Sequence, residues 1–165
     1  MNKKILAVAA VLAVFGIFGA SAKNSTSLGL QAGYNPAGGW GPAITFKVAS
    51  LPCVFAADVG FTSDAQLASV GVTADWWIAN PRLAGMLNYY YGPGVAVAFH
   101  TTSSAPALDV DFRAVAGLNI FPINFLELYA QVAWQPGIYI PFYEGSKISF
   151  SWWSLPINAG FRFWF

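Results

Sequence analysis

Apolar residues occupy every second position along most of the chain after residue 22, and the positions between them are small or polar. The pattern is most regular over 108–121, where Val110 and Phe112 alternate with Asp111 and Arg113. A period of two residues is typical of a β-strand whose faces meet different environments. Turn-forming residues separate the alternating stretches. The pattern predicts about eight strands, over 25–34, 43–50, 53–61, 67–78, 87–100, 108–121, 125–140 and 148–165.

The part of the chain after residue 22 offers no convincing apolar helix. The stretch 83–108 lacks Asp, Glu, Lys and Arg, but Gly92-Pro93-Gly94 interrupts it, and we expect a bulge or bend there instead. A second bulge is expected at Leu155-Pro156. Without helices, a closed barrel is the structure that satisfies every backbone group in lipid.

Composition indicates that this barrel lies in a membrane. The 165 residues are 56% hydrophobic, 17% aromatic and only 9% charged, whereas a soluble domain usually carries about 25% charged residues. So little charge cannot coat a soluble surface, and this argues against a soluble, lipocalin-like barrel. The formal net charge of +1 gives no reason to expect nucleic acid as a partner. We predict an all-β fold, a transmembrane antiparallel up-and-down β-barrel.

The mid-strand charges fall on the face opposite the Val, Leu and Phe side chains. This face is predicted to line the lumen, which about eight strands make just wide enough for side chains. Charges so buried must pair or stay hydrated. A packed polar core that locks the barrel is favoured over a narrow, slightly cation-preferring pore. The predicted lumen charges are Lys47, Asp58, Asp75, Asp109, Asp111, Arg113, Glu127 and Arg162.

The first 22 residues have the features of a cleavable signal peptide. Lys3 and Lys4 precede an apolar run, and Ala20-Ser21-Ala22 forms an A-x-A cleavage site. The run is short for a membrane-spanning helix, which needs about 20 residues. We therefore expect 1–22 to be removed and 23–165 to form one barrel domain.

The C-terminal residues resemble the recognition signal of bacterial outer-membrane barrels. Asn158, Gly160, Phe163 and the terminal Phe165 match that signal position by position. With the signal peptide and the strand pattern, the whole mature chain is similar to the small barrels of the OmpA, OmpX and OmpW type. The resemblance implies residence in the outer membrane of a diderm bacterium, as a monomer. It implies outer-membrane lipid, the barrel-assembly machinery and periplasmic chaperones as partners.

The resemblance also implies an orientation, because the terminal signal belongs at the periplasmic side in this family. Both chain ends would lie there, and the loops 35–42, 62–66, 101–107 and 141–147 would face outward. Tryptophan and tyrosine form girdles at both interfaces of such barrels. The expected periplasmic girdle is Trp76, Trp77 and Trp164, and the expected outer girdle is Trp40, Tyr143, Trp152 and Trp153.

Few residues suggest chemistry. His100, Ser103, Ser104 and Asp109 lie near one another in a predicted outer loop, as a lipid-modifying enzyme of the outer membrane would need, but no motif supports catalysis. Asp109 and Asp111 beside Arg113 are typical of an ion-pair cluster rather than a metal site. The chain has one cysteine, Cys53, and one histidine, which excludes an internal disulfide and a zinc site. We expect no enzymatic activity, no cofactor and no metal.

Three functions remain open at this point. The leading one is a structural integral outer-membrane protein, with or without narrow-pore activity. The second is an OmpW-like transporter of small hydrophobic molecules, for which Tyr90 and Tyr129 would line an apolar path that opens sideways. The third is a surface adhesin or interaction protein, which the short, weakly charged predicted loops make less favourable.

Overall fold

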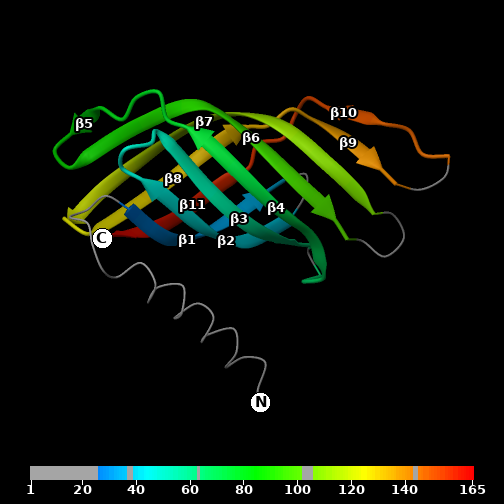
Figure 1. The fold of residues 1–165 in the computed structure, drawn as a ribbon, viewed down its shortest axis with the longest axis horizontal. Helices are drawn as coiled ribbons and strands as arrows, with labels where there is room; N and C mark the ends of the chain where they lie inside the picture. The colour runs from blue at the N-terminus through cyan, green and yellow to red at the C-terminus, as the bar shows by residue number, and fades with distance from the viewer. Residues whose placement is uncertain (1–25, 37–38, 63, 102–105, 143–144) are drawn as a thin grey trace, which may run out of the picture.

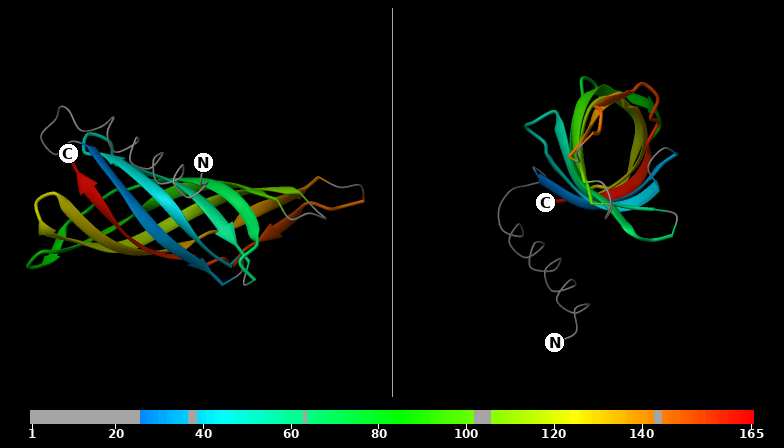
Figure 2. Two further views of the ribbon diagram at one scale, coloured as in Figure 1. Left: turned by 90° about the horizontal axis from the view of Figure 1, so that it is seen from below. Right: turned by 90° about the vertical axis from the view of Figure 1, so that its right-hand side faces the viewer.

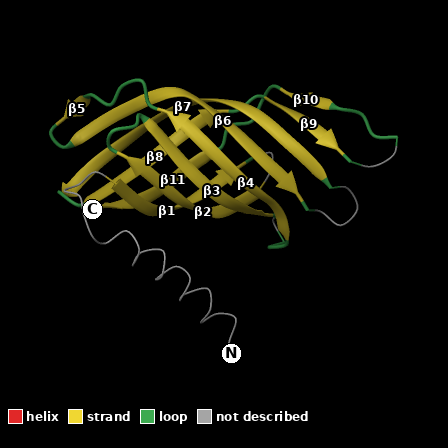
Figure 3. Ribbon diagram, viewed as in Figure 1, coloured by secondary structure: helices red, strands yellow, loops and turns green. Residues whose placement is uncertain are grey.

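The computed structural model describes residues 26–36, 39–62, 64–101, 106–142 and 145–165, and this part consists of strands and their connections (Figure 3). The predicted signal peptide, 1–22, lies outside the described residues. The strands are β1 (Thr26–Asn35), β2 (Gly39–Val48), β3 (Cys53–Phe61), β4 (Leu67–Trp76), β5 (Arg82–Ala84), β6 (Leu87–His100), β7 (Ala107–Ile123), β8 (Leu126–Trp134), β9 (Gly137–Pro141), β10 (Ser149–Ser151) and β11 (Ile157–Trp164).

Eight of these strands form a closed antiparallel ring. Hydrogen bonding runs in the order β7-β8-β11-β1-β2-β3-β4-β6, and the pairing of β6 with β7 closes it. Seen along the long axis of the barrel, the strands surround a central space (Figure 2, right). The predicted fold, an all-β antiparallel barrel of eight strands, is confirmed.

Prolines divide the two last predicted strands. The stretch 125–140 is observed as β8 and β9, separated at Gln135-Pro136, and 148–165 as β10 and β11, separated by 152–156. Proline has no N–H to donate to a ladder. The carbonyls of Pro136 and Pro156 still accept bonds from Phe112 and Ala133, each of 3.0 Å. β9 pairs with the first residues of β7, and β10 pairs with β9, so this hairpin extends beyond the ring (Figure 2, left).

The predicted bulge at Gly92-Pro93-Gly94 is not in β6. The ladder of β6 with β7 is regular from Leu87 to His100. The pairing that is interrupted is the one on the other side of β6, with β4, which ends at Trp76. A methyl group at Gly92 would overlap the carbonyl oxygen of Trp76. The glycine therefore allows the backbone after β4 to approach β6 closely, and this places the next side chain, Trp77, inside the barrel.

The two ends of the barrel differ in their connections. Thr26 and Trp164 lie at one end, here called the terminal end, together with the tight turns that follow β2 and β7 (Figures 1 and 2). The opposite end, here called the loop end, carries the connections β1–β2, β3–β4, β6–β7 and β9–β10. The first of these is shorter than the predicted loop 35–42, because β2 already begins at Gly39.

The outer and inner faces of the wall have opposite polarity. Large apolar side chains such as Val72, Phe112 and Val132 are exposed on the outside, whereas charged side chains such as Glu127 and Arg162 are fully buried inside. This is the arrangement that the alternation predicts, and the reverse of a soluble protein. Among the described residues, no helix is long and apolar enough to cross a membrane.

Candidate functional site: the lumen of the barrel

The terminal half of the lumen is filled by a network around one buried ion pair. Arg162 of β11 donates from Nε to Glu127 Oε2 of β8 over 3.0 Å and from Nη2 to Oε1 over 3.1 Å. Both side chains are fully buried. Asn119 Nδ2 and Trp164 Nε1 donate to the same carboxylate over 2.8 and 2.9 Å. A carboxylate with this many donors is held in one position, which a buried ion pair needs to be stable.

An aromatic stack covers this ion pair. The Trp77 ring lies 3.7 Å from the Tyr90 ring, centroid to centroid. Lys47 Nζ lies 3.6 Å from the Trp77 ring centroid, and Arg162 Cζ lies 4.1 Å from that of Tyr129. A cation over an aromatic face is favourable, more so where water is excluded. The predicted lumen cations Lys47 and Arg162 are thus built into the packing of the terminal half.

Two residues predicted for the periplasmic girdle belong to this interior instead. Trp77 is only 4% exposed, and the Trp164 indole donates to Glu127. Trp76, Trp40, Trp152 and Trp153 are exposed, and Tyr143 lies outside the described residues. The girdle prediction was therefore wrong for Trp77 and Trp164. The ring of Trp77 packs on Tyr90 and Lys47 inside the barrel, and the indole N–H of Trp164 donates to Glu127 there.

Two tyrosine–glycine–glutamine bridges span the wall of the lumen. Gly117 of β7 pairs with Tyr90 on one side and Gln131 on the other, and Tyr90 Oη donates across it to Gln131 Oε1 over 2.9 Å. Gly160 of β11 likewise lies between Tyr129 and Gln31, and Tyr129 Oη donates to Gln31 Oε1 over 2.9 Å. Tyr90 and Tyr129 are buried in these bridges. Tyr90 also borders an apolar groove in the wall beside Gly117, whereas Tyr129 does not line it.

A second ionic network lies between the two halves. Arg113 of β7 donates from Nε to Asp75 Oδ1 over 2.8 Å and from Nη2 to Oδ2 over 3.3 Å. Arg113 Nη1 also donates to Gln135 Oε1, and Gln135 Nε2 donates to Asp111 Oδ2. The predicted charges Asp75, Arg113 and Asp111 are therefore joined in one chain of hydrogen bonds, with Arg113 and Asp75 each 3% exposed.

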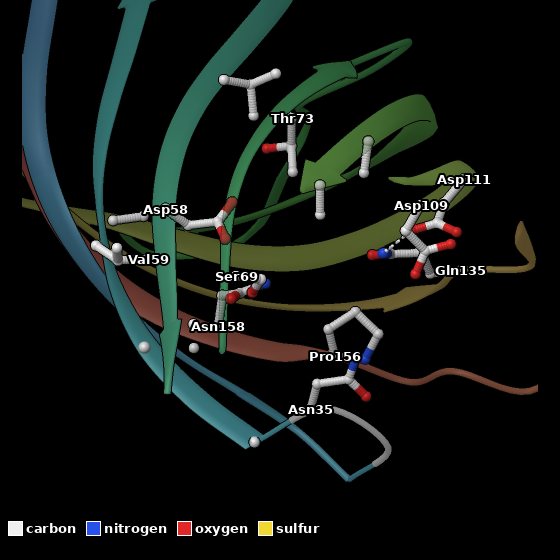
Figure 4. A pocket seen from close by; sticks show the side chains of 18 of the residues that line it. Asn35, Asp58, Val59, Ser69, Thr73, Asp109, Asp111, Gln135, Pro156 and Asn158 are labelled. Atoms are coloured by element: carbon white, nitrogen blue, oxygen red, sulfur yellow. Dashed lines mark hydrogen bonds between the residues drawn. The ribbon is translucent and has the colours of Figure 1, made fainter. Parts of the chain in front are cut away.

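The loop half of the lumen is hollow. A cavity of about 160 Å³, here called the loop-end cup, extends from Arg113 to the β1–β2 turn. Asp58 of β3 reaches into it from one wall, and Asp109 and Asp111 of β7 reach into it from the opposite wall (Figure 4). The remaining two predicted lumen charges, Asp58 and Asp109, thus belong to the cup and not to the packed half.

Glycines opposite the polar side chains were missed by the sequence reasoning. A methyl group at Gly29 would lie 2.6 Å from Arg162 Cγ, and one at Gly71 would lie 2.9 Å from Asp58 Oδ2. A methyl group at Gly94 would overlap Asp75 Oδ1, and one at Gly137 would overlap Asp111 Oδ1. Each charged side chain lies flat over a glycine of the neighbouring strand. An inward-facing glycine is the sequence signal, but its partner depends on the strand register.

The residues considered for catalysis are only partly brought together. His100 Nε2 lies 3.6 Å from Asp109 Oδ2, and Ser103 and Ser104 lie outside the described residues. In the part of the chain that the structure covers, no group of three His, Cys, Asp or Glu side chains is arranged to hold a metal ion. Cys53 is buried at the terminal end.

The residues of the predicted assembly signal are divided between the two faces of β11. Asn158 is buried on the lumen side, as a residue of the cup, and Gly160 lies under the Tyr129–Gln31 bridge. Phe163 packs on the outside, with its ring 6.4 Å from that of Phe125. Phe165 exchanges backbone hydrogen bonds with Thr26, so the end of the chain is fixed where the first and last strands meet.

Comparison with known proteins gives one structural likeness. No protein-family model matches the sequence, and no curated protein matches it. Among solved structures, the chain is similar to the crystal structure of Neisserial surface protein A (NspA), with a TM-score of 0.52 and 15% identity over 85% of this chain and 97% of that chain. NspA is an eight-stranded outer-membrane β-barrel of the OmpA-like superfamily. The chain therefore shares its fold with NspA, and this fold is the eight-stranded barrel that the sequence predicted.

Proposed function

We propose that the protein is an integral outer-membrane β-barrel with a structural role, and that its lumen is closed by the terminal-half network. In this proposal, residues 1–22 are a cleaved signal peptide. Periplasmic chaperones carry the mature chain, and the barrel-assembly machinery reads Asn158, Gly160, Phe163 and Phe165. The barrel then resides as a monomer in outer-membrane lipid, with the terminal end toward the periplasm.

The exposed apolar wall supports the membrane location. Side chains such as Val70, Val95 and Phe112 are between 40% and 60% exposed on the outside of the ring. In water this surface would be a large aggregation liability, whereas in lipid it is the outer face that a transmembrane barrel needs. The likeness to NspA adds the precedent of an outer-membrane barrel with the same fold.

The buried Glu127–Arg162 pair is the observation that carries the closed lumen. Both side chains have no exposed area, and Trp77 and Tyr90, packed beside them, are nearly as buried. A path for ions through the terminal half would require these side chains to separate. Removing one partner of a buried ion pair costs about 3–5 kcal/mol because the other charge is left uncompensated. Separating Glu127 from Arg162 would leave both charges uncompensated, and this favours a closed state over a conducting one.

Single-channel recording in a planar bilayer tests this proposal. The refolded mature protein is expected to be silent, and Arg162→Ala, which removes half of the pair, is expected to lose heat resistance on a gel. Discrete openings of the wild type whose size or ion preference changes in Arg162→Ala and Arg113→Ala would instead make the lumen a pore. Arg82→Ala, in exposed β5, is the matched control.

Transport of small hydrophobic molecules is the second candidate, and one observation favours it. An apolar groove on the outside of the wall lies behind Gly117, with Tyr89 and Tyr91 on one side and Ile157 on the other. Uptake of a small apolar dye into vesicles that contain the protein tests this function. Uptake that Ala116→Trp abolishes would support transport, because the indole would fill the floor of the groove; uptake equal to that of empty vesicles would exclude it.

A further inference from the structure

The loop-end cup contains polar side chains that bond to no other side chain. Within the described residues, Asp58 of β3, Ser69 and Thr73 of β4 and Asn158 of β11 line the cup, and none of these side chains has a hydrogen-bond or ion-pair partner. Asn158 is only 8% exposed. Asn158 is the buried one of the four, and a buried polar group without a partner costs about 1–3 kcal/mol; Asp58, Ser69 and Thr73 are half-buried and also lack a partner. Such groups, directed into one cavity from three strands (Figure 4), indicate a ligand that would satisfy them.

Glycines of the wall give the cup its space and place these side chains. Asn158 pairs with Gly33, Ser69 with Gly60, and Asp58 with Gly71. A methyl group at Gly33 would overlap Asn158 Oδ1, and one at Gly60 would overlap Ser69 Oγ. The polar atoms therefore lie close to the wall and leave the middle of the cup open.

The charge of the cup selects a cation. Asp58, Asp109 and Asp111 contribute carboxylates, and the nearest cation, Arg113, is already bonded to Asp75 over 2.8 Å and to Gln135. His100 is near Asp109 only. A cleft lined by one sign of charge with low-dielectric walls concentrates ions of the opposite sign. Among the described residues, the cup therefore holds three carboxylates, and no basic side chain is bonded to Asp58 or directly to Asp111.

The arrangement of the acceptors favours an organic ammonium over a bare metal ion. Among the described residues, no three acidic or histidine side chains converge on one point, which an ion that sheds its water shell needs. Carboxylates instead stand on opposite walls, with carbonyl and hydroxyl oxygens between them (Figure 4). An ammonium group donates three hydrogen bonds, so it suits several oxygen acceptors. The size of the ligand follows from the volume of the cavity, because one water-sized group occupies about 30 Å³. A cavity of about 160 Å³ therefore holds roughly five or six non-hydrogen atoms.

We propose that the loop-end cup binds a small aliphatic diamine in its doubly protonated form. One ammonium bonds to Asp58, Asn158 and the hydroxyl of Thr73, and the other bonds to Asp109 and Asp111. This inference does not depend on whether the barrel conducts, because the cup is open to the loop end and the packed half lies beyond Arg113.

Calorimetric titration of the refolded protein in a non-ionic detergent, with 1,4-diaminobutane as the probe, tests the proposal. Asp58→Asn is expected to weaken binding about tenfold or more, the effect of losing one hydrogen bond to a charged group. Asp64→Asn changes an exposed acid of the loop-end connection β3–β4 that does not line the cup, and it is expected to leave binding unchanged. 1-Aminobutane, with one ammonium, is expected to bind more weakly than the diamine.

Three results would overturn the proposal: no heat of binding to the wild type, equal affinity of Asp58→Asn, or displacement of the diamine by Mg²⁺ as effectively as by the diamine itself. The last would mean that the cup exerts only a general negative potential. A difference in gel mobility between heated and unheated samples verifies that each variant is folded before it is titrated.

Discussion

Tyr90 and Gln131 are bonded to each other across a strand that lies between them. Tyr90 Oη donates to Gln131 Oε1 over 2.9 Å, and Gly117, which pairs with both residues, provides the gap that the phenol ring occupies. The same arrangement recurs one strand further on, where Tyr129 reaches Gln31 over Gly160. In each bridge, one side-chain hydrogen bond links the two outer strands of three, and the glycine of the middle strand leaves the space for it.

Removing the hydroxyl of Tyr90 should destabilise the barrel without changing its shape. Tyr90→Phe leaves the ring stacked on Trp77 but orphans the buried Gln131 oxygen, and we expect a loss of about 1–3 kcal/mol in the free energy of unfolding. Tyr89→Phe and Tyr91→Phe change neighbours that are exposed on the outer face and should cost little. Urea unfolding in lipid vesicles, followed by tryptophan fluorescence, measures the difference. Equal stability of Tyr90→Phe and the controls would mean that the bridge contributes nothing.

The Glu127–Arg162 pair should show strong coupling. Arg162→Met leaves a buried carboxylate without its cation and is expected to cost about 3–5 kcal/mol, whereas the double variant Arg162→Met with Glu127→Met should cost less than the sum of the single variants. Arg82→Met, in exposed β5, controls for loss of an arginine. A double-mutant cycle from urea unfolding gives the coupling energy, and additive effects would contradict the pairing.

A glycine under a charged side chain should not tolerate a methyl group. Gly29→Ala would place a carbon against the backbone carbonyl oxygen of Phe161 and 2.6 Å from Arg162 Cγ, and relief of the overlap is expected to cost about 1–3 kcal/mol. Ala32→Val enlarges an exposed position on the outer face of the same strand and should be nearly neutral. Comparison of the two urea midpoints is the measurement. A neutral Gly29→Ala would show that the backbone of β11 and the Arg162 side chain can both shift without loss of stability.

The end of the chain should matter for assembly more than for stability. Phe165→Ser keeps the backbone bonds to Thr26, so the purified variant is expected to refold in detergent at nearly the rate of the wild type. In cells, the fraction that reaches the outer membrane should fall, because the proposed recognition signal loses its terminal aromatic. Phe150→Ser, an exposed aromatic of β10 outside the signal, is the control. Normal insertion of Phe165→Ser would remove the assembly role of this residue.

Alternation along the sequence was enough to predict the ring, the number of its strands and the polarity of both faces, because each strand separates an apolar outside from a polar inside. It could not predict which inner side chains meet. Glu127 and Arg162 are far apart in the sequence, and their pairing depends on the register of β8 with β11. Likewise Trp76 and Trp77 are adjacent and chemically equal, and only the close approach of the backbone to Gly92 decides that Trp77 turns inward.

The prolines were equally insufficient to predict where the last strands end. Pro136 and Pro156 were visible in the sequence, but a proline can end a strand, form a bulge or lie at an edge. In the barrel both interrupt their strands at the loop end, and this gives β9 and β10 a separate hairpin. The cup could not be anticipated either, since the empty space depends on glycines of neighbouring strands that meet polar side chains.

The uneven filling of the lumen has a consequence for how such a protein can change over evolutionary time. The bonded side chains of the lumen are concentrated around Glu127 and Arg162 in the terminal half, whereas Asp58, Ser69, Thr73 and Asn158 of the cup bond to no other side chain. Substitution of any of these four therefore removes no internal bond. A lineage could change the chemistry of the loop end, residue by residue, while the other half continues to hold the wall together.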